Sequence, residues 1–284
     1  TSFINKIPGA KKKHHFFLPL MPYAVEQFDL SDYDIVISSS HSCAKGIITK
    51  PSTLHICYCH TPMRYCWDNW QQYFENFGIA SPLKAQARKM LHELRIWDRL
   101  AADRADIFLA NSQNVARRIT KYYKREATVI YPPIDWNGFE PTGRSTQAAY
   151  FLAVGRLTPY KRFDLLVDTF NELKLPLLIV GKGKQEKELK KHAGRFITFL
   201  GHIPDEDLLK VYQNSMALIF PQEEDMGLIP LEAMSAGKPV IAYGKGGALE
   251  TVVPGKTGLF FEEQTVDSLK RAILEFGALK WDTA

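Results

Sequence analysis

The fold is decided most clearly by residues 219–243, which read IFPQEEDMGLIPLEAMSAGKPVIAY. An apolar run ends at Phe220, an acidic loop follows, and Gly227 opens a stretch of helical character over 228–236. A second apolar run, 239–243, comes directly after that stretch. An apolar run, a helix and another apolar run in this order predict a βαβ unit, from which parallel sheets are built.

The same alternation extends over almost the whole chain. Further apolar runs of strand length lie at 35–40, 54–60, 107–112, 127–131, 149–155, 177–181, 196–200 and 216–220. Amphipathic stretches typical of helices lie at 160–173, 205–214 and 265–277. The strand candidates are apolar throughout instead of alternating, which indicates parallel strands covered on both faces. The sequence therefore predicts an α/β protein.

A break in this pattern lies at 132–148, where Pro132 and Pro133 end a strand and a polar stretch with Gly138 and Gly143 follows. Proline removes donors from a sheet and glycine loosens the chain, so this stretch is the natural linker. We expect two Rossmann-like domains, roughly residues 1–140 and 146–284.

Composition narrows the class of protein. The chain has 284 residues, 45% of them hydrophobic, and a net charge of +5. This mild charge suits an anionic ligand or an acidic membrane surface and argues against nucleic acid as a partner. No apolar run reaches the roughly 18–20 residues of a membrane span. The four cysteines form no CxxC pair, which favours reduced thiols and a cytoplasmic location.

Two glutamates flank the start of the predicted helix 228–236. Glu224 lies in the acidic loop, Glu232 lies in the helix, and seven residues separate them. Ligands of open α/β sheets bind beyond the carboxyl ends of the strands, where this loop must lie. Paired carboxylates there suit a hydroxyl-rich ligand, and Gly227 would let the backbone approach it. The alternative is a solvated acidic loop followed by an exposed glutamate.

A second polar cluster follows the predicted strand 149–155, in the segment GRLTPYK of residues 155–161. Arg156 and Lys161 flank a turn that leads into the predicted helix 160–173. Each cation alone would be an ordinary surface charge. Two cations beside a helix N-terminus form a site for a diphosphate.

Two glycine-containing loops follow other predicted strands. They are VGKG at 180–183 and GKGG at 244–247. Such a loop can approach a ligand, but it can equally be a tight turn that packs a strand onto a helix. Neither loop predicts nucleotide binding by itself.

Taken in order, these segments resemble the C-terminal half of the family 4 glycosyltransferases, which have the GT-B fold. The matching segments over about 150–262 are GRLTPYK at 155–161, VGKG at 180–183, FLGHI at 199–203, EEDMGLIPLEAMSAGKPVIA at 223–242 and GGALE at 246–250. His60-Thr61-Pro62 with Arg64, and Ala110-Asn111-Ser112 before a helix, resemble the family's bacterial polysaccharide and O-antigen branch.

The resemblance implies two domains that face a cleft, with the donor bound mainly to the C-terminal one. Arg156 and Lys161 would hold the diphosphate, Glu232 the ribose hydroxyls and Glu224 the hydroxyls of the transferred sugar. His60 would reach the sugar from the opposite domain. His202 and Ile203 would lie where the family seats the base. The other donor contacts implied by the family are Gly155, Gly181 and the backbone of Met226, Gly227, Leu228 and Ile229.

The activity implied by the resemblance is retaining hexosyl transfer from a nucleotide sugar. A UDP-sugar such as UDP-glucose is the favoured donor and GDP-mannose the next. The acceptor would be a polysaccharide or a lipid-linked glycan at the inner face of the membrane. Cations and helix-terminal N–H groups would stabilise the leaving diphosphate, so we expect no metal, no cofactor and no protein nucleophile.

The resemblance has two gaps. Family members begin with a strand and a glycine-rich loop, and they end with helices that cross back to the first domain. Neither feature is recognisable between Thr1 and Ala284. We therefore expect an incomplete N-terminal domain, and a noncatalytic nucleotide-sugar-binding module stays open as the alternative. A nicotinamide dehydrogenase is disfavoured because no GxGxxG follows the first strand.

Some motifs point to metals. Asp32-Tyr33-Asp34 spells the DxD of metal-dependent transferases, but it precedes a strand and is interpreted as a solvated turn. A zinc site would need His55, Cys57, Cys59 and His60, whose spacing is that of a strand without a second ligand pair. Buried small side chains are the favoured interpretation.

The stretch 83–104 combines cations with apolar residues at helical spacing. The cations are Lys84, Arg88, Lys89, Arg95, Arg99 and Arg104, and the apolar residues are Leu83, Met90, Leu91, Leu94, Trp97 and Leu100. An interfacial membrane helix would show this pattern, and so would a core-packed helix with a basic outer face, which we favour. Residues 11–15, KKKHH, add either a basic surface near the membrane or a solvated loop.

Overall fold

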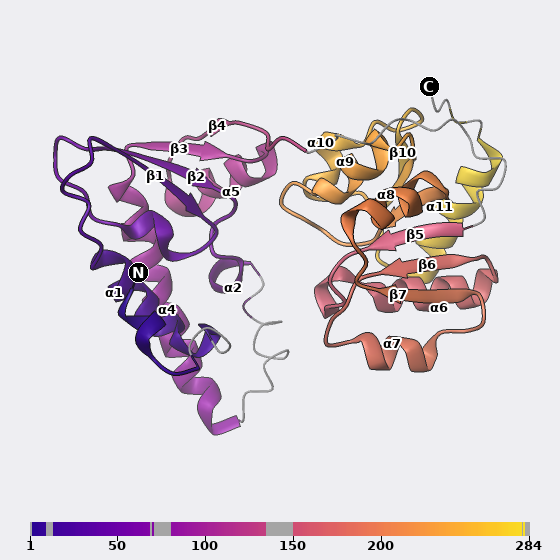
Figure 1. The fold of residues 1–284 in the computed structure, drawn as a ribbon, viewed down its shortest axis with the longest axis horizontal. Helices are drawn as coiled ribbons and strands as arrows, with labels where there is room; N and C mark the ends of the chain where they lie inside the picture. The colour runs from indigo at the N-terminus through magenta and orange to yellow at the C-terminus, as the bar shows by residue number, and fades with distance from the viewer. Residues whose placement is uncertain are drawn as a thin grey trace. The chain divides into compact units, whose positions relative to one another are not determined.

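The protein is described by a computed structural model that covers residues 2–9, 14–68, 70, 81–134, 150–279 and 281. Its contacts divide the chain into two compact units, Thr1–Pro132 and Pro133–Ala284. Each unit contains a parallel sheet with helices packed against it (Figure 1). The predicted α/β class is therefore confirmed. Of the predicted linker 132–148, residues 135–148 lie outside the described residues.

The first unit is built on a four-stranded sheet in the order β1-β2-β3-β4, with every neighbouring pair parallel. The strands are β1 (Ile35–Ser40), β2 (Leu54–Cys59), β3 (Ile107–Ala110) and β4 (Thr128–Val129). The helices are η1 (Phe3–Lys6), η2 (His14–Leu20), α1 (Met21–Glu26), η3 (Cys43–Gly46), α2 (Arg64–Trp67), α4 (Ser81–Ala101), η4 (Ala102–Arg104) and α5 (Gln113–Tyr123).

The second unit has a six-stranded parallel sheet in the order β10-β9-β8-β5-β6-β7. The strands are β5 (Tyr150–Val154), β6 (Leu177–Val180), β7 (Ile197–Gly201), β8 (Ser215–Phe220), β9 (Val240–Tyr243) and β10 (Gly258–Phe261). The helices are η5 (Pro159–Lys161), α6 (Phe163–Leu173), α7 (Glu186–His192), α8 (Asp205–Gln213), α9 (Leu228–Ser235), α10 (Ala248–Thr251) and α11 (Val266–Ala278). This strand order is that of a Rossmann fold.

Both faces of the second sheet are buried. Successive residues of β8 point to opposite faces, so Ala217 and Ile219 join one core cluster while Leu218 and Phe220 join the other. Helices α6 and α11 supply the first cluster, and α8 and α9 contribute to the second. This double burial explains why the strand sequences are apolar throughout.

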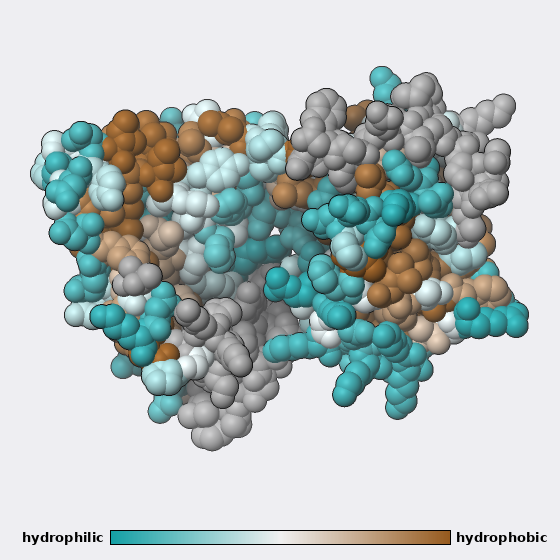
Figure 2. Space-filling view, viewed as in Figure 1, coloured by the Kyte–Doolittle hydropathy of each residue, from teal (hydrophilic) through white to brown (hydrophobic). Residues whose placement is uncertain are grey.

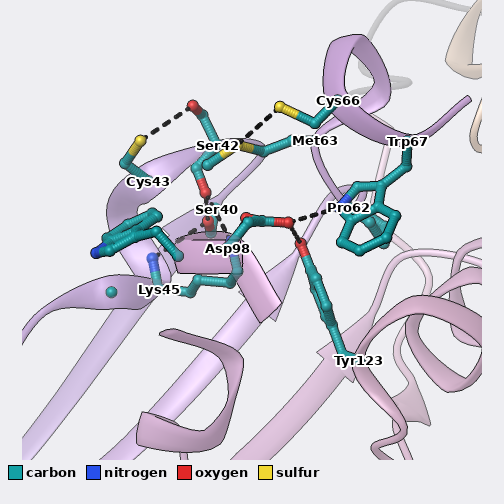
Figure 3. Close-up of polar contacts among 12 residues, drawn as sticks. Ser40, Ser42, Cys43, Lys45, Pro62, Met63, Cys66, Trp67, Asp98 and Tyr123 are labelled. Carbon is teal, nitrogen blue, oxygen red and sulfur yellow. Dashed lines mark hydrogen bonds and ion pairs between the residues drawn. The ribbon is translucent and has the colours of Figure 1, made fainter. Parts of the chain in front are cut away.

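The first unit contains a buried ion pair between Lys45 of η3 and Asp98 of α4, with side chains 1% and 0% exposed (Figure 3). The second carboxylate oxygen of Asp98 accepts a hydrogen bond from Trp67 Nε1 at 2.7 Å and another from Tyr123 Oη at 2.8 Å. One carboxylate thus ties η3, α2, α4 and α5 together at the carboxyl end of β1 and β2.

Helix α4 is packed against the core of the first unit, as favoured from its sequence. Leu91 and Leu94 are buried, and Met90 and Trp97 pack against the same cluster, whereas Leu100 is exposed. No helix in the described part of the chain is both long and apolar enough to cross a membrane. The basic segment at residues 11–15 lies outside the described residues or side chains.

Candidate functional site

The candidate site lies where the order of the second sheet reverses. Strands β5 and β8 are neighbours, and the chain continues outward to β6 and β7 on one side and to β9 and β10 on the other. The loops that follow β5 and β8 therefore diverge. Open α/β sheets bind ligands in the crevice formed beyond the carboxyl ends of such a pair of strands.

A salt bridge joins these two loops. Lys161 Nζ, in the turn after β5, lies 3.0 Å from Glu224 Oε1, in the loop after β8. Their side chains are only 12% and 19% exposed, so the pair is partly shielded from solvent. Gly155 stands beside Lys161, since a Cβ at Gly155 would lie 3.5 Å from Lys161 Nζ. Arg156, the other predicted cation of this turn, is exposed.

The loop after β9 is anchored to the same place. Gly247 N donates to Glu224 O at 2.9 Å. Gly227 has a φ of 80°, a conformation that suits glycine, and it caps the start of α9. Helix α9 begins with the N–H groups of Leu228 and Ile229, which follow Glu224 and the buried Met226 along the chain. Such N–H groups have no acceptor within their own helix and favour anions.

Glu232 lies one turn further along α9 and is held by a buried tyrosine. Its Oε2 accepts a hydrogen bond from Tyr212 Oη at 2.8 Å. Burial and the nearby Glu232 carboxylate raise the pKa of the Tyr212 hydroxyl, so the tyrosine stays a donor. Tyr212 fixes the orientation of the Glu232 carboxylate from the core side, and the binding of ribose hydroxyls by Glu232 stays a prediction.

The VGKG loop after β6 packs directly on the loop after β5. A Cβ at Gly181 would lie 1.9 Å from Gly155 O, so only glycine fits there. A tight packing turn, the alternative interpretation of this motif, is therefore sufficient to explain the glycine at 181. The contact of Gly181 with a donor stays a prediction. His202 is exposed after β7, and Ile203 packs against the core beneath it.

His60 belongs to the first unit, directly after β2. Its Nε2 lies 2.8 Å from Ser39 Oγ at the end of β1, and its ring meets the Tyr58 ring edge-on at 5.2 Å. His60 is therefore held at the carboxyl ends of β1 and β2, where it follows β2 and bonds to a serine of β1. Its predicted contact with the sugar stays a prediction.

Two motifs resemble metal sites: the DxD of residues 32–34 lies in an exposed turn, and the His and Cys residues of 55–59 lie in the buried strand β2. Asp32, Tyr33 and Asp34 make up the exposed turn before β1, as interpreted from the sequence. His55 Nε2 is hydrogen-bonded to Ser38 Oγ at 2.8 Å, and Cys57 and Cys59 are buried free thiols, in keeping with the favoured interpretation of this segment. Within the described ranges, no three His, Cys, Asp or Glu side chains come together as metal ligands.

Sequence reasoning missed two residues of this region. The helix position of Tyr212 marks it only as a core residue. Gln222, two residues beyond the end of β8, is 1% exposed, and the sequence carries no signal of its burial. The direct pairing of Lys161 with Glu224 was also not predicted, although each residue was placed after the end of a predicted strand.

Comparison with known proteins shows a family. The sequence profile described as glycosyl transferases group 1 matches residues 134–280, and that of glycosyltransferase family 4 matches residues 2–137. An uncharacterised glycosyltransferase of Methanocaldococcus jannaschii is 28% identical over 188 residues, which cover 64% of this chain and 52% of the relative.

Two further proteins extend the comparison. A GDP-mannose-dependent monoacylated alpha-(1-6)-phosphatidylinositol monomannoside mannosyltransferase of Corynebacterium glutamicum is 28% identical over 251 residues, 70% of this chain and 65% of the relative. The crystal structure of Anabaena HepE in complex with UDP-glucose superimposes with a TM-score of 0.63 at 18% identity, over 97% of this chain and 74% of that one.

The chain thus spans between about half and two thirds of the length of these two curated relatives. The group 1 profile covers the second unit, including the loops after β5, β8 and β9 that meet at Glu224. The profile match and the sheet order agree on one assignment: the chain belongs to the glycosyl transferases group 1 family.

Proposed function

We propose that this chain binds a nucleotide sugar at the β5–β8 switch point and transfers its hexose with retention of anomeric configuration. The observation that carries the proposal is the Lys161–Glu224 pair, which sets a cation and a hydroxyl-binding carboxylate 3.0 Å apart where a Rossmann sheet binds its ligand. A nucleotide sugar presents the matching groups, a diphosphate beside a ring of hydroxyls.

In the proposed reaction, the site stabilises the negative charge that develops on the leaving group. Lys161, Arg156 and the N–H groups at the start of α9 stabilise the nucleoside diphosphate as the sugar becomes oxocarbenium-like. One well-placed donor of this kind contributes about 3–4 kcal/mol. Glu224 binds hydroxyls of the sugar, and Glu232 binds the ribose. With this set of donors, the reaction proceeds without a metal ion.

The donor is a UDP-hexose or GDP-mannose, and two of the similar proteins support one alternative each. The HepE structure holds UDP-glucose, whereas the C. glutamicum relative is named for GDP-mannose and for a phosphatidylinositol mannoside. For this chain we propose a polysaccharide or lipid-linked glycan as acceptor, at the cytoplasmic face of the membrane.

Thermal unfolding with UDP, GDP, ADP and NAD, each with magnesium or with EDTA, tests the donor site. A ligand at about 100 times its Kd stabilises the native state by about 2.7 kcal/mol. We expect a higher Tm with UDP or with GDP that is the same in EDTA. No shift with either nucleotide, or a shift that EDTA abolishes, would contradict the proposal.

The stereochemical course needs a separate measurement. Slow hydrolysis of the preferred nucleotide sugar, followed by proton NMR, reports the anomer released before mutarotation. An α-configured donor should first give the α-sugar. The β-sugar as first product would show inversion.

A further inference from the structure

An unpaired amide is buried in the loop that forms the candidate site. Gln222 follows β8 by two residues, and its side chain is 1% exposed. Among the residues that the structure describes, neither Gln222 Nε2 nor Gln222 Oε1 has a hydrogen-bond partner. Buried polar groups are nearly always paired, so an amide with both ends unpaired calls for a physical reason.

The loop around this amide is held firmly at neighbouring positions. Gln264 Nε2 donates to Pro221 O at 2.7 Å, immediately before Gln222. Two residues after it, Glu224 is bound through its side chain to Lys161 and through its carbonyl oxygen to Gly247 N. The unpaired amide is therefore not the result of a loosely packed loop.

The chemistry of the amide limits what it can bind. Glutamine offers two N–H donors and one carbonyl acceptor, so it matches a group that both donates and accepts. A sugar hydroxyl does both, whereas a phosphate oxygen at neutral pH mainly accepts. A hydroxyl is therefore the ligand group that satisfies both ends of Gln222.

We propose that Gln222 binds a hydroxyl of the transferred sugar and is a determinant of donor-sugar specificity. This inference rests on the proposed function, because it requires a nucleotide sugar at the switch point. The Lys161–Glu224 pair links the two. A diphosphate that becomes the counter-ion of Lys161 replaces one of the contacts that hold this loop, and the Gln222 amide then turns to the sugar.

The test compares Gln222→Leu with the matched variant Gln264→Leu. Leucine is close to glutamine in size and removes only the amide. Gln264→Leu removes an amide of the loop between β10 and α11, which has partners on Pro221 and Arg162. For both variants and the wild type, Tm is measured without ligand, and Kd is measured for UDP, UDP-glucose, GDP and GDP-mannose.

We expect Gln222→Leu to keep or raise the unliganded Tm, since an unpaired buried amide is removed. Its Kd for the free nucleotide should be unchanged, while its preference for the sugar nucleotide over the nucleotide should fall about tenfold. Gln264→Leu should lower the unliganded Tm, because the bond to Pro221 O is lost.

The inference is overturned if Gln222→Leu keeps the wild-type preference for the sugar nucleotide, or if it lowers the unliganded Tm as Gln264→Leu does. Those outcomes leave the proposed function intact, because the wild type still binds nucleotide. If the wild-type protein binds none of the four ligands, the proposed function is wrong, and this inference is wrong as well.

Discussion

The two sheets of this protein differ in how their faces are covered. In the second unit, core clusters lie on both faces of the sheet. In the first unit, the cluster around Cys57, Phe108 and Ala110 covers one face. On the other face, Ile35, Ile37, Leu54 and Ile107 are between 38% and 69% exposed, and we call these four residues the open face. Figure 2 shows apolar side chains at the surface of this unit.

The difference shows that apolar strand sequence alone does not establish burial. Both sheets are parallel and have apolar strands, and the sequence predicted two covered faces for each. In the second unit this prediction is confirmed, because apolar clusters pack on both faces of the sheet. The first unit has several smaller apolar clusters and, beside them, the polar network around Asp98. Stability should therefore depend on different residues in the two units.

The largest effect is expected from the buried ion pair of the first unit. Asp98→Ala leaves the Lys45 ammonium buried without its carboxylate and removes the acceptor for Trp67 and Tyr123. Loss of one partner of a buried pair costs about 3–5 kcal/mol. Urea unfolding followed by tryptophan fluorescence measures the change.

The double variant Lys45→Met/Asp98→Leu is the control, because it removes both charges. It should be more stable than Asp98→Ala. If the double variant is the less stable of the two, the buried charge is not the cause of the destabilisation.

A matched pair of isoleucines tests the two sheets directly. Ile219 of β8 is 1% exposed, and Ile37 of β1 is 69% exposed. Ile219→Ala should lower the free energy of unfolding by about 2–5 kcal/mol. Ile37→Ala should change it by no more than about 0.5 kcal/mol. Equal losses in urea unfolding would show that the open face is covered in solution.

Tyr212 tests the buried polar contact of the second unit. Tyr212→Phe removes the hydroxyl that donates to Glu232 Oε2 at 2.8 Å, while the ring stays in the core. We expect a loss of about 1.5–3 kcal/mol, the range for a hydrogen bond to a charged group. Because Glu232 loses its orienting partner, nucleotide affinity should fall as well. Unchanged affinity in a calorimetric titration would count against the role of Glu232.

The pH dependence of the first unit should reflect His55, which is fully buried. Burial lowers the pKa of His55 below its ordinary value of 6.5. Below that pH the unfolded chain binds a proton that the folded one does not, so the free energy of unfolding falls as pH decreases through and below 6.5.

The measurement compares urea unfolding at about pH 7.5 and about pH 5.5 for the wild type and His55→Gln. The variant should lose less stability on acidification than the wild type, because it has no imidazole to protonate. The same loss in both proteins would assign the pH dependence to other groups.

The sequence predicted the elements whose signal is local. The run 35–40 became β1 with the same bounds, and the predicted helix 228–236 became α9 within one residue. Strand β10, Gly258–Phe261, was not predicted, because a four-residue apolar run has no periodicity to separate it from a loop. Helix α7 was also missed, since its single buried residue, Leu189, gives no apolar face.

The candidate site was predictable where it depends on strand ends. Parallel strands bring their following loops to one edge, which makes the loops of Lys161 and Glu224 candidates for ligand binding. Their assignment to one donor came from the resemblance to the family. The roles of Tyr212 and Gln222 depend on which groups surround them in space. That the buried Gln222 amide has no partner among the described residues is a property of the folded loop, which the residue type alone does not indicate.

The central claim is that the β5–β8 switch point binds the diphosphate of a nucleotide through Lys161. Calorimetric titration of UDP and GDP into Lys161→Met tests it, with Lys270→Met, a salt-bridged lysine of α11, as control. Loss of a charged hydrogen bond should weaken the preferred nucleotide about 10- to 100-fold in Lys161→Met and leave Lys270→Met as tight as the wild type. Wild-type affinity in Lys161→Met would contradict the account.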